Sequence, residues 1–325
     1  MKVLVTGATG FLGSAVVRAL ASRGHDVVAM ARPAAKLPES SSSLIAFVRG
    51  DLRQKGEWCE AIRGIDAVVH AAAATGGGFP DQFASTVVAT ENLLDCIDWK
   101  SLKRFVLISS FSVYDYAGGP RSVDERHPLE PKPSRRDAYT WTKMLQEDLA
   151  ASTCARHDVP FVSIRPGAIY GPGKDWDSGA ALKLGKVDLI FSPLAKLRLT
   201  HVDNCAEAIA AAVDADGVEG VFNIVDDEAP THARYHRICR KAGSSAARAV
   251  FIPWWVVATA GLGVKLVNKA LFGGKARLPE ILDYPRQQAR WRPFNYSNER
   301  AKAELGWNPR VRMEDATRLM FGNGK

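Results

Sequence analysis

A tyrosine stands four residues before a lysine in the stretch DAYTWTK, residues 137–143. At that spacing Tyr139 and Lys143 lie on the same face of a helix. A phenol with an ordinary pKa of about 10 is a weak base at neutral pH, but a neighbouring ammonium group favours its ionised form. The pair could therefore exchange a proton with a substrate oxygen. The same spacing also arises by chance on solvated helices, so the rest of the sequence must decide between the two interpretations.

A glycine-rich loop follows the first apolar run, in VTGATGFLGSAVVRAL at residues 5–20. Gly7 can take the tight turn, Gly10 leaves room for a pyrophosphate near the backbone, and Gly13 lets the next helix pack closely on a sheet. The N-terminus of that helix then faces the negative charge. Because the pattern lies between a strand and an amphipathic helix, it predicts a dinucleotide site formed by Gly7, Thr9, Gly10, Phe11, Leu12 and Gly13.

The end of the second apolar run, AMARPAAK at residues 29–36, should meet the adenosine ribose of such a dinucleotide. An acidic residue there would bind a 2′-hydroxyl, but the position holds Arg32, with Lys36 close behind. A guanidinium binds phosphate through forked, charge-assisted hydrogen bonds, so we expect NADP in preference to NAD. The alternative is that Arg32 is an ordinary surface arginine.

Two further segments follow apolar runs at places where a cofactor would lie. Asp51 and Leu52 come after the third run and could frame an adenine ring, although an aspartate here is almost as typical of an ordinary turn. Small residues follow the fourth run in HAAAATGGG at 70–78. They could let a cofactor approach the backbone, or they could serve close helix packing. The candidate cofactor contacts here are Ala71, Ala72 and Ala73.

Apolar runs alternate with helical stretches up to about residue 170, at 2–6, 26–31, 44–49, 67–72, 104–109 and 160–165. Runs that are apolar on both faces indicate a parallel sheet covered by helices on both sides, and right-handed crossovers give a doubly wound Rossmann sheet. The predicted class is α/β, with a smaller, mostly helical C-terminal substrate lobe. We assign 1–170 to the nucleotide-binding core, with 198–226 returning to it, and 171–197 and 227–325 to the lobe.

Taken in order, the motifs of this chain resemble the extended short-chain dehydrogenase/reductase family. That family includes nucleotide-sugar epimerases and dehydratases, 3β-hydroxysteroid dehydrogenase-like enzymes and dihydroflavonol reductase-like enzymes. The resemblance covers nearly the whole chain and rests on TGATGFLG, VVHAAA, ISSFSVY, YTWTK, IRPGAIYGPG, THVDNCAEAI and AKAELGWNP. It implies an enzyme that uses NAD(P).

The resemblance also implies a catalytic set of Ser110, Tyr139 and Lys143. Ser110 would bind the substrate oxygen, Tyr139 would act as acid and base, and Lys143 would support Tyr139 and bind the nicotinamide ribose. Ser109 and Ser112 are weaker alternatives to Ser110.

Further along, Pro166, Gly167 and Ile169 match the family segment that lies beside the nicotinamide. One departure concerns Thr86, which stands where the family often has an asparagine. Whether Thr86 takes over the role of that asparagine is left open.

The stretch VFIPWWVVATAGLGVKLVNKALF, residues 250–272, resembles the helix on the substrate side of hydroxysteroid dehydrogenase-like members. A nucleotide-sugar enzyme would need an arginine for the diphosphate, but Leu197 holds that position and Arg198 is one residue out of register. We therefore predict an NADP-dependent ketoreductase or alcohol dehydrogenase for a fairly apolar substrate. A nucleotide-sugar 4-epimerase or reductase is the alternative, and a non-catalytic NADP-sensing protein is a third. Weak candidates for substrate contact are Ser112, Tyr170, Arg198 and Trp254.

Composition limits the partners and the cellular setting. The formal charge of +8 suits an anionic ligand, but the basic residues read as scattered and not clustered with aromatics, so no nucleic-acid partner is predicted. Five cysteines without a CxxC motif argue against a disulfide framework and for a reducing cytoplasm. The longest apolar stretch has 12 residues before Lys265, too few to span a bilayer, so we predict no stable membrane insertion and leave peripheral contact open. No metal site is predicted, and we expect a homodimer or a monomer.

Overall fold

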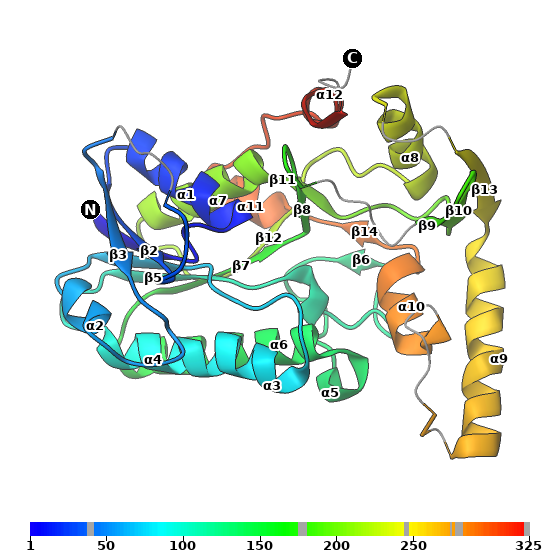
Figure 1. Ribbon diagram of the computed structural model, residues 1–325, viewed down its shortest axis with the longest axis horizontal. Helices are drawn as coiled ribbons and strands as arrows, with labels where there is room; N and C mark the ends of the chain where they lie inside the picture. Colours follow the sequence, from blue (N-terminus) through cyan, green and yellow to red (C-terminus); the bar gives the residue numbers. More distant parts are fainter. Residues whose placement is uncertain (38–41, 175–180, 244–246, 274, 277–281, 322–325) are drawn as a thin grey trace.

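The structure, a computed structural model, describes residues 1–37, 42–174, 181–243, 247–273, 275–276 and 282–321 (Figure 1). Its central sheet has seven strands in the order β12-β7-β5-β4-β1-β2-β3, and all neighbouring strands are parallel. The strand order reverses between β1 and β4, the point at which open α/β sheets bind ligands. The strands are β1 Lys2–Thr6, β2 Asp26–Ala31, β3 Ile45–Arg49, β4 Ala67–His70, β5 Arg104–Ile108, β7 Phe161–Pro166 and β12 Gly220–Ile224.

Helices cover both faces of this sheet, which explains why the central strands are apolar on both sides. In Figure 1, α1, α7 and α11 lie over one face, and α2, α3, α4 and α6 lie over the other. The expected doubly wound α/β fold is therefore confirmed. The bounds are α1 Phe11–Ser22, α2 Trp58–Ala61, α3 Phe79–Phe83, the π-helical η1 Ala84–Val88, α4 Ala89–Cys96, α6 Ala138–Arg156, α7 Val202–Asp214 and α11 Glu299–Leu305.

The remaining elements form the C-terminal lobe and short connections. Strand β10 pairs with β13 in parallel and with β9 in antiparallel fashion, and β6 pairs with β14. The lobe thus contains a small sheet beside its helices. The strands are β6 Ser122–Val123, β8 Ala168–Tyr170, β9 Ala181–Leu184, β10 Val187–Phe191, β11 Leu199–His201, β13 Arg248–Ile252 and β14 Asn295–Tyr296. The helices are η2 Phe111–Val113, α5 Pro133–Arg136, α8 His232–Lys241, α9 Trp254–Phe272, α10 Tyr284–Trp291 and α12 Met313–Phe321.

The segment 198–226 contributes to the core through α7 and β12. Its first strand, β11, instead pairs with β8 in a separate two-stranded sheet. The reason is that β8 follows β7 directly and offers β11 a free edge outside the main sheet. The division of the chain into core and lobe stays a prediction.

Cys59 and Cys96 form a disulfide between α2 and the end of α4. The sequence argument against disulfides was therefore wrong for this pair. The two cysteines are 37 residues apart in sequence, and the packing of α2 against α4 brings their Cα atoms to 5.1 Å. Spacing along the chain could not reveal that proximity. The other three cysteines, Cys154, Cys205 and Cys239, are buried and do not form disulfides.

The apolar segment of the lobe folds into a longer helix than the sequence argument allowed. α9 has 19 residues because it continues through Lys265 and Lys269. Of the helices in the described part of the chain, it alone is long and apolar enough to cross a membrane, with a mean hydropathy of 1.3. Only 17% of its apolar window is buried.

Candidate active site

The loop between β1 and α1 leaves no space for side chains at two of its glycines. Gly7 has a φ of 67°, which favours glycine. A Cβ at Gly13 would lie 2.0 Å from the carbonyl oxygen of Gly7, and one at Gly7 would lie 3.0 Å from the amide nitrogen of Ala72. Gly10 precedes α1, and its amide donates to the Gly7 oxygen at 2.9 Å. The loop is a tight backbone cradle at a helix N-terminus, which fits a pyrophosphate.

The remaining loop residues surround this cradle. Thr9 is exposed just before the helix, and Phe11 and Leu12, half-buried, form its first turn. Two alanines that follow β4, the strand paired with β1, lie across from this loop. The amide of Ala72 donates to the Thr6 hydroxyl at 3.3 Å, and Ala71 packs against the core. The sequence-predicted loop and alanine segment therefore meet at the carboxyl ends of β1 and β4, and Ala73 continues that segment.

The residues expected around the adenosine lie at the ends of β2 and β3. Arg32 and Lys36 are exposed after β2, and Leu52 is buried after β3. Hydrogen bonds from Arg53, with a smaller effect from the charge of Arg32, hold the pKa of Asp51 below its ordinary value. The side chains of Arg32 and Asp51 therefore lie close enough for their charges to interact.

Arg49 is a contributor that the sequence argument missed. Its guanidinium donates to the backbone oxygens of Arg32 at 3.5 Å and Ala35 at 3.2 Å, and so it holds the turn that carries Arg32. A basic residue at the end of the neighbouring strand was the signal that could have found it.

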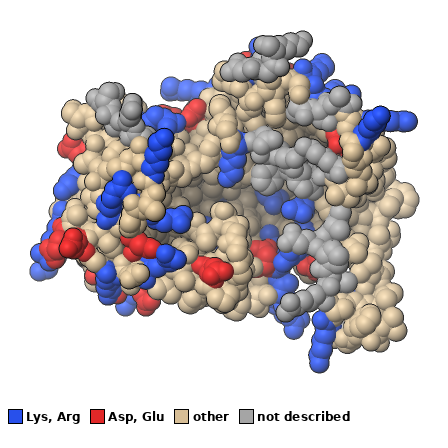
Figure 2. All heavy atoms as spheres, viewed as in Figure 1, with Lys and Arg blue, Asp and Glu red and all other residues tan. Residues whose placement is uncertain are grey.

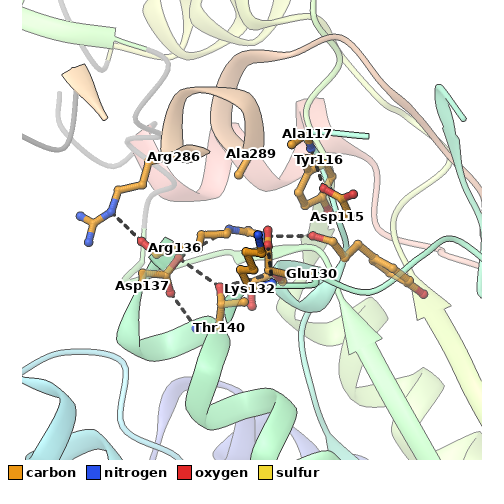
Figure 3. Close-up of polar contacts among 12 residues, drawn as sticks. Asp115, Tyr116, Ala117, Glu130, Lys132, Arg136, Asp137, Thr140, Arg286 and Ala289 are labelled. Atoms are coloured by element: carbon orange, nitrogen blue, oxygen red, sulfur yellow. Dashed lines mark hydrogen bonds and ion pairs between the residues drawn. The ribbon is translucent and has the colours of Figure 1, made fainter. Parts of the chain in front are cut away.

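The helix α6 starts at Ala138 because Asp137 caps it (Figure 3). The Asp137 carboxylate accepts from the Thr140 amide at 2.6 Å and from the Thr140 hydroxyl at 3.1 Å. Tyr139 therefore lies in the first helical turn, where the cap fixes its backbone. Ser110, which follows β5, lies close enough to Tyr139 to oppose the effect of burial on the pKa of its hydroxyl. The structure therefore brings these two predicted catalytic residues near one another.

The residue before the cap, Arg136, ties this helix end to two other segments. It is buried, donates to the backbone oxygen of Tyr114 at 2.8 Å, and lies 3.7 Å from the carboxylate of Glu130. Its own carbonyl accepts from Arg286 of α10 at 3.0 Å (Figure 3). The C-terminal lobe therefore contacts the start of the helix that carries Tyr139.

Lys143 lies one turn further along α6, in a buried polar network. Its ammonium group donates to the Ile108 carbonyl at 2.7 Å and to the Gln146 side-chain oxygen at 2.8 Å. The Gln146 amide nitrogen in turn donates to Thr90 at 2.8 Å and lies 3.1 Å from a ring nitrogen of His70. The sequence argument missed Gln146 and His70, since a buried glutamine on a helix carries no motif.

Burial changes the proton affinity of these groups. It lowers the pKa of Lys143 to about 7, against the opposing charge of Glu147. It also lowers the pKa of His70 to about 3, with help from the charge of Lys143, so this imidazole is neutral. For Tyr139, burial raises the pKa and the Ser110 hydrogen bond opposes it. The Tyr139 pKa is therefore raised and not lowered as expected, because desolvation of the phenol is the largest effect on it.

The segment predicted to lie beside the nicotinamide begins at the end of β7 and continues into β8. Pro166 ends β7, the amide of Gly167 donates to the Ile224 carbonyl at 2.9 Å, and Ile169 lies in β8. Thr86 is buried in η1, where its hydroxyl accepts from the Ala74 amide at 3.1 Å. This bond ties Thr86 to the loop after β4.

The four weak candidates for substrate contact do not form one group. Ser112 lies two residues after Ser110, the candidate catalytic serine, and its amide donates to the Ser110 hydroxyl at 3.1 Å. Tyr170 is fully buried and its hydroxyl donates to Asp226, so it faces the interior. Arg198 stacks on the ring of Tyr116 at 4.7 Å, while Trp254 is half-buried at the start of α9.

The amino-acid sequence of the chain is similar to known protein sequences over most of its length. Residues 3–224 match the profile of the NAD dependent epimerase/dehydratase family. The chain is 31% identical to a 2-alkyl-3-oxoalkanoate reductase of Stenotrophomonas maltophilia over 66% of each sequence. It is 27% identical to a 3-diazoavenalumate denitrifying reductase of Streptomyces over 95% of this chain and 96% of that protein. A 3-beta-hydroxysteroid dehydrogenase of Mycolicibacterium neoaurum is 32% identical, over 53% of this chain and 48% of that one.

Solved structures match the whole fold. UDP-glucuronic acid 4-epimerase of Bacillus cereus in complex with NAD superposes with a TM-score of 0.73 at 21% identity, over 99% of this chain and 98% of the other. UDP-glucose 4-epimerase of Thermus thermophilus, also with NAD, gives a TM-score of 0.71 at 22% identity over the full length of both chains. At these identities the likeness concerns the fold.

Proposed function

Because the chain belongs to the NAD dependent epimerase/dehydratase family, whose members are enzymes of the extended short-chain dehydrogenase/reductase type, we propose that it is an NADP-dependent ketoreductase or alcohol dehydrogenase. Its substrate would be a fairly apolar ketone or the corresponding alcohol. The observation that carries this proposal is the proximity of Ser110 to Tyr139, with Lys143 one helical turn further along α6.

The chain offers a fitting cradle for a dinucleotide. The Gly7 and Gly13 backbone would hold the pyrophosphate, since added side chains at either glycine meet backbone atoms. Arg32 would bind the 2′-phosphate of the adenosine ribose, because its exposed guanidinium follows β2 and no acidic residue occupies that position. When bound, the nicotinamide of the cofactor supplies or accepts hydride.

The chain's own residues would handle the substrate oxygen and its proton. Ser110 orients the carbonyl by donating a hydrogen bond to its oxygen. Tyr139 keeps its proton at neutral pH because burial raises its pKa, and so it is ready to donate that proton to the developing alkoxide. Lys143, held by the Ile108 carbonyl and Gln146, supplies positive charge when protonated and stabilises the phenolate left behind.

Arg198 favours the reductase over a nucleotide-sugar enzyme. Its guanidinium donates to the Ala289 carbonyl at 3.1 Å and stacks on Tyr116, so these contacts already hold the arginine nearest to the diphosphate-binding position. Binding a sugar diphosphate there would require breaking them. Two of the three relatives named above are reductases, and the 2-alkyl-3-oxoalkanoate named for one of them is an alkyl-substituted ketone.

The proposal is tested by anaerobic oxidation of NADPH with steroid-like, flavonoid-like and polyketide-like ketones, alkyl-substituted 3-oxoacids and nucleotide-sugars. We expect turnover of one or more apolar ketones, and a loss of at least about a hundredfold in kcat for Tyr139→Phe. NADPH binding by that variant should be retained, measured by fluorescence titration. Turnover of nucleotide-sugars alone would establish the epimerase or sugar reductase alternative, and a cellular role that survives Tyr139→Phe unchanged would favour the NADP sensor.

The choice of cofactor is tested separately with Arg32→Asp. The variant removes the proposed phosphate contact and supplies a carboxylate for a 2′-hydroxyl. We expect the ratio of kcat/KM for NADPH to that for NADH to fall by at least about tenfold, since charge-assisted hydrogen bonds are roughly twice as strong as neutral ones. Arg63→Asp, at an exposed arginine outside the proposed site, is the matched control. Equal ratios in wild type and Arg32→Asp would refute the assignment.

A further inference from the structure

The outer side of α9 is apolar and exposed. Trp255, Leu262 and Leu266 are 68%, 44% and 58% exposed, and their spacing of seven and four residues places them on one stripe of the helix. Leu271 and Phe272 extend the exposed apolar surface at the C-terminal end, with exposures of 71% and 58%. Large apolar patches on soluble proteins mark contacts with other molecules.

The sequence around this helix is strongly basic. Residues 229–279 contain nine lysines and arginines and no aspartate or glutamate, whereas the rest of the chain has 34 basic and 35 acidic residues. This segment therefore accounts for the whole excess of positive charge, although Lys and Arg side chains are also spread over the rest of the face shown in Figure 2. In the helix itself, Lys265 and Lys269 are both exposed beside the apolar stripe.

A basic cavity lies directly before α9 in the fold. It has a volume of about 540 Å³ and opens between α8 and β13, where Arg237, Arg240, Lys241 and Arg248 line it together with half-exposed Phe251. None of the described residues that line it is acidic. In Figure 1, α8, β13 and α9 follow one another along one edge of the molecule, so the cavity and the apolar helix lie on adjoining surface. Such a cavity suits a phosphate group.

The inner side of α9 shows how the helix would meet a membrane. Gly261 packs so closely on Gln287 of α10 that an added Cβ would overlap that side chain, and Asn268 exchanges two hydrogen bonds with the backbone of Ala276. Lys265 lies over the ring of Tyr284, also in α10. A spanning orientation would draw these polar contacts into hydrocarbon, which is costly, so the helix must lie flat.

We propose that α9 and the basic cavity form a peripheral docking surface for an anionic phospholipid bilayer. The stripe of Trp255, Leu262 and Leu266 enters the boundary between headgroups and acyl chains, and a lipid phosphate occupies the cavity between α8 and β13. The charge of the segment 229–279 selects the partner, because a neutral apolar partner or a second copy of this equally basic face would gain nothing from it. This inference does not depend on the proposed substrate or cofactor.

Vesicle flotation with the full-length protein tests the proposal. We expect co-flotation with vesicles of phosphatidylcholine and phosphatidylglycerol, little with phosphatidylcholine alone, and a decrease as salt is raised. Leu266→Gln should lower the partition coefficient at least about tenfold, because it removes an apolar side chain from the acyl boundary. Lys269→Glu should lower it at least about fivefold, the factor expected for one basic residue near an anionic surface.

Two substitutions in α12 provide matched controls. Leu319 is 61% exposed on that helix, close to the 58% of Leu266, and Arg318 is likewise exposed there. Leu319→Gln and Arg318→Glu should leave flotation unchanged, and thermal melting confirms that all four variants fold. Absence of flotation with anionic vesicles, or equal losses for Leu266→Gln and Leu319→Gln, would overturn the proposal. Sedimentation velocity without lipid tests the alternative of a dimer. If the protein is a dimer that Leu266→Gln dissociates, the face binds a second copy of the chain instead of a membrane.

Discussion

Replacing Lys143 with methionine should change how the stability of the protein depends on pH. Burial lowers the pKa of Lys143 to about 7, whereas an unfolded chain protonates a lysine up to about pH 10.5. Between these values the unfolded state binds one more proton than the folded state, so the wild-type free energy of unfolding rises with pH. Below about pH 7 both states are protonated and the full cost of the buried charge is present. Lys143→Met removes this dependence.

The magnitude follows from the same two pKa values. One pKa unit corresponds to about 1.4 kcal/mol, so wild type should gain up to roughly 5 kcal/mol relative to the variant across the whole interval, and about 2–3 kcal/mol between pH 7 and pH 9. Methionine has a similar volume but leaves the Ile108 carbonyl and the Gln146 oxygen without a donor. That loss costs about 1–3 kcal/mol per acceptor at every pH and therefore does not affect the slope.

Urea unfolding at half-unit steps between about pH 6.5 and pH 9.5 measures this difference, because the other titrating groups are common to both proteins and cancel. Lys100→Met, at an exposed turn position, is the matched control and should run parallel to wild type. A difference between wild type and Lys143→Met that stays constant over this range would refute the reasoning, because it would mean that the ammonium group is not desolvated.

Three further predictions concern neighbouring parts of the site. Gly13→Ala places a Cβ about 2.0 Å from a backbone oxygen, so NADPH affinity in a fluorescence titration should fall at least about tenfold, whereas Gly263→Ala, with open space around it, should not change it. Gln146→Glu sets a carboxylate beside Lys143 and raises its pKa, so the rise in stability between pH 7 and pH 9 should shrink in the same urea series. Asp137→Ala removes the cap of α6, which should cost about 0.5–2 kcal/mol in urea unfolding and lower kcat.

The fold followed from the sequence because its signals are local. Each strand of the core is a short apolar run bounded by glycines or polar residues, and helices between the runs require a parallel sheet. The loop at Gly7 was predictable for the same reason, since its conformation depends on residues within one βα unit. The pairing of β11 with β8 could not be predicted, because it depends on which strand edge is free, and an edge is a property of the folded chain.

Features that depend on distant contacts escaped the sequence argument. The disulfide joins Cys59 to Cys96 only because α2 packs against α4. Gln146 looks like any polar residue of a helix, and only its burial between Lys143 and Thr90 gives it a role. The pKa of Tyr139 was expected to fall because charge pairs can be read from spacing, whereas the depth of burial that raises it cannot.

One buried hydrogen-bond network connects the glycine loop after β1 with Lys143 on α6. Thr6, the last residue of β1 before the glycine loop, contacts a ring nitrogen of His70 at 2.7 Å, and Gln146 links that ring to Lys143. The same Thr6 hydroxyl accepts from the Ala72 amide at the edge of the cradle. Because His70 is neutral, it joins these elements without adding a second charge beside Lys143. The position of the ammonium group is thus coupled to the backbone that would hold the cofactor, which explains why a polar network persists where an apolar core would be more stable.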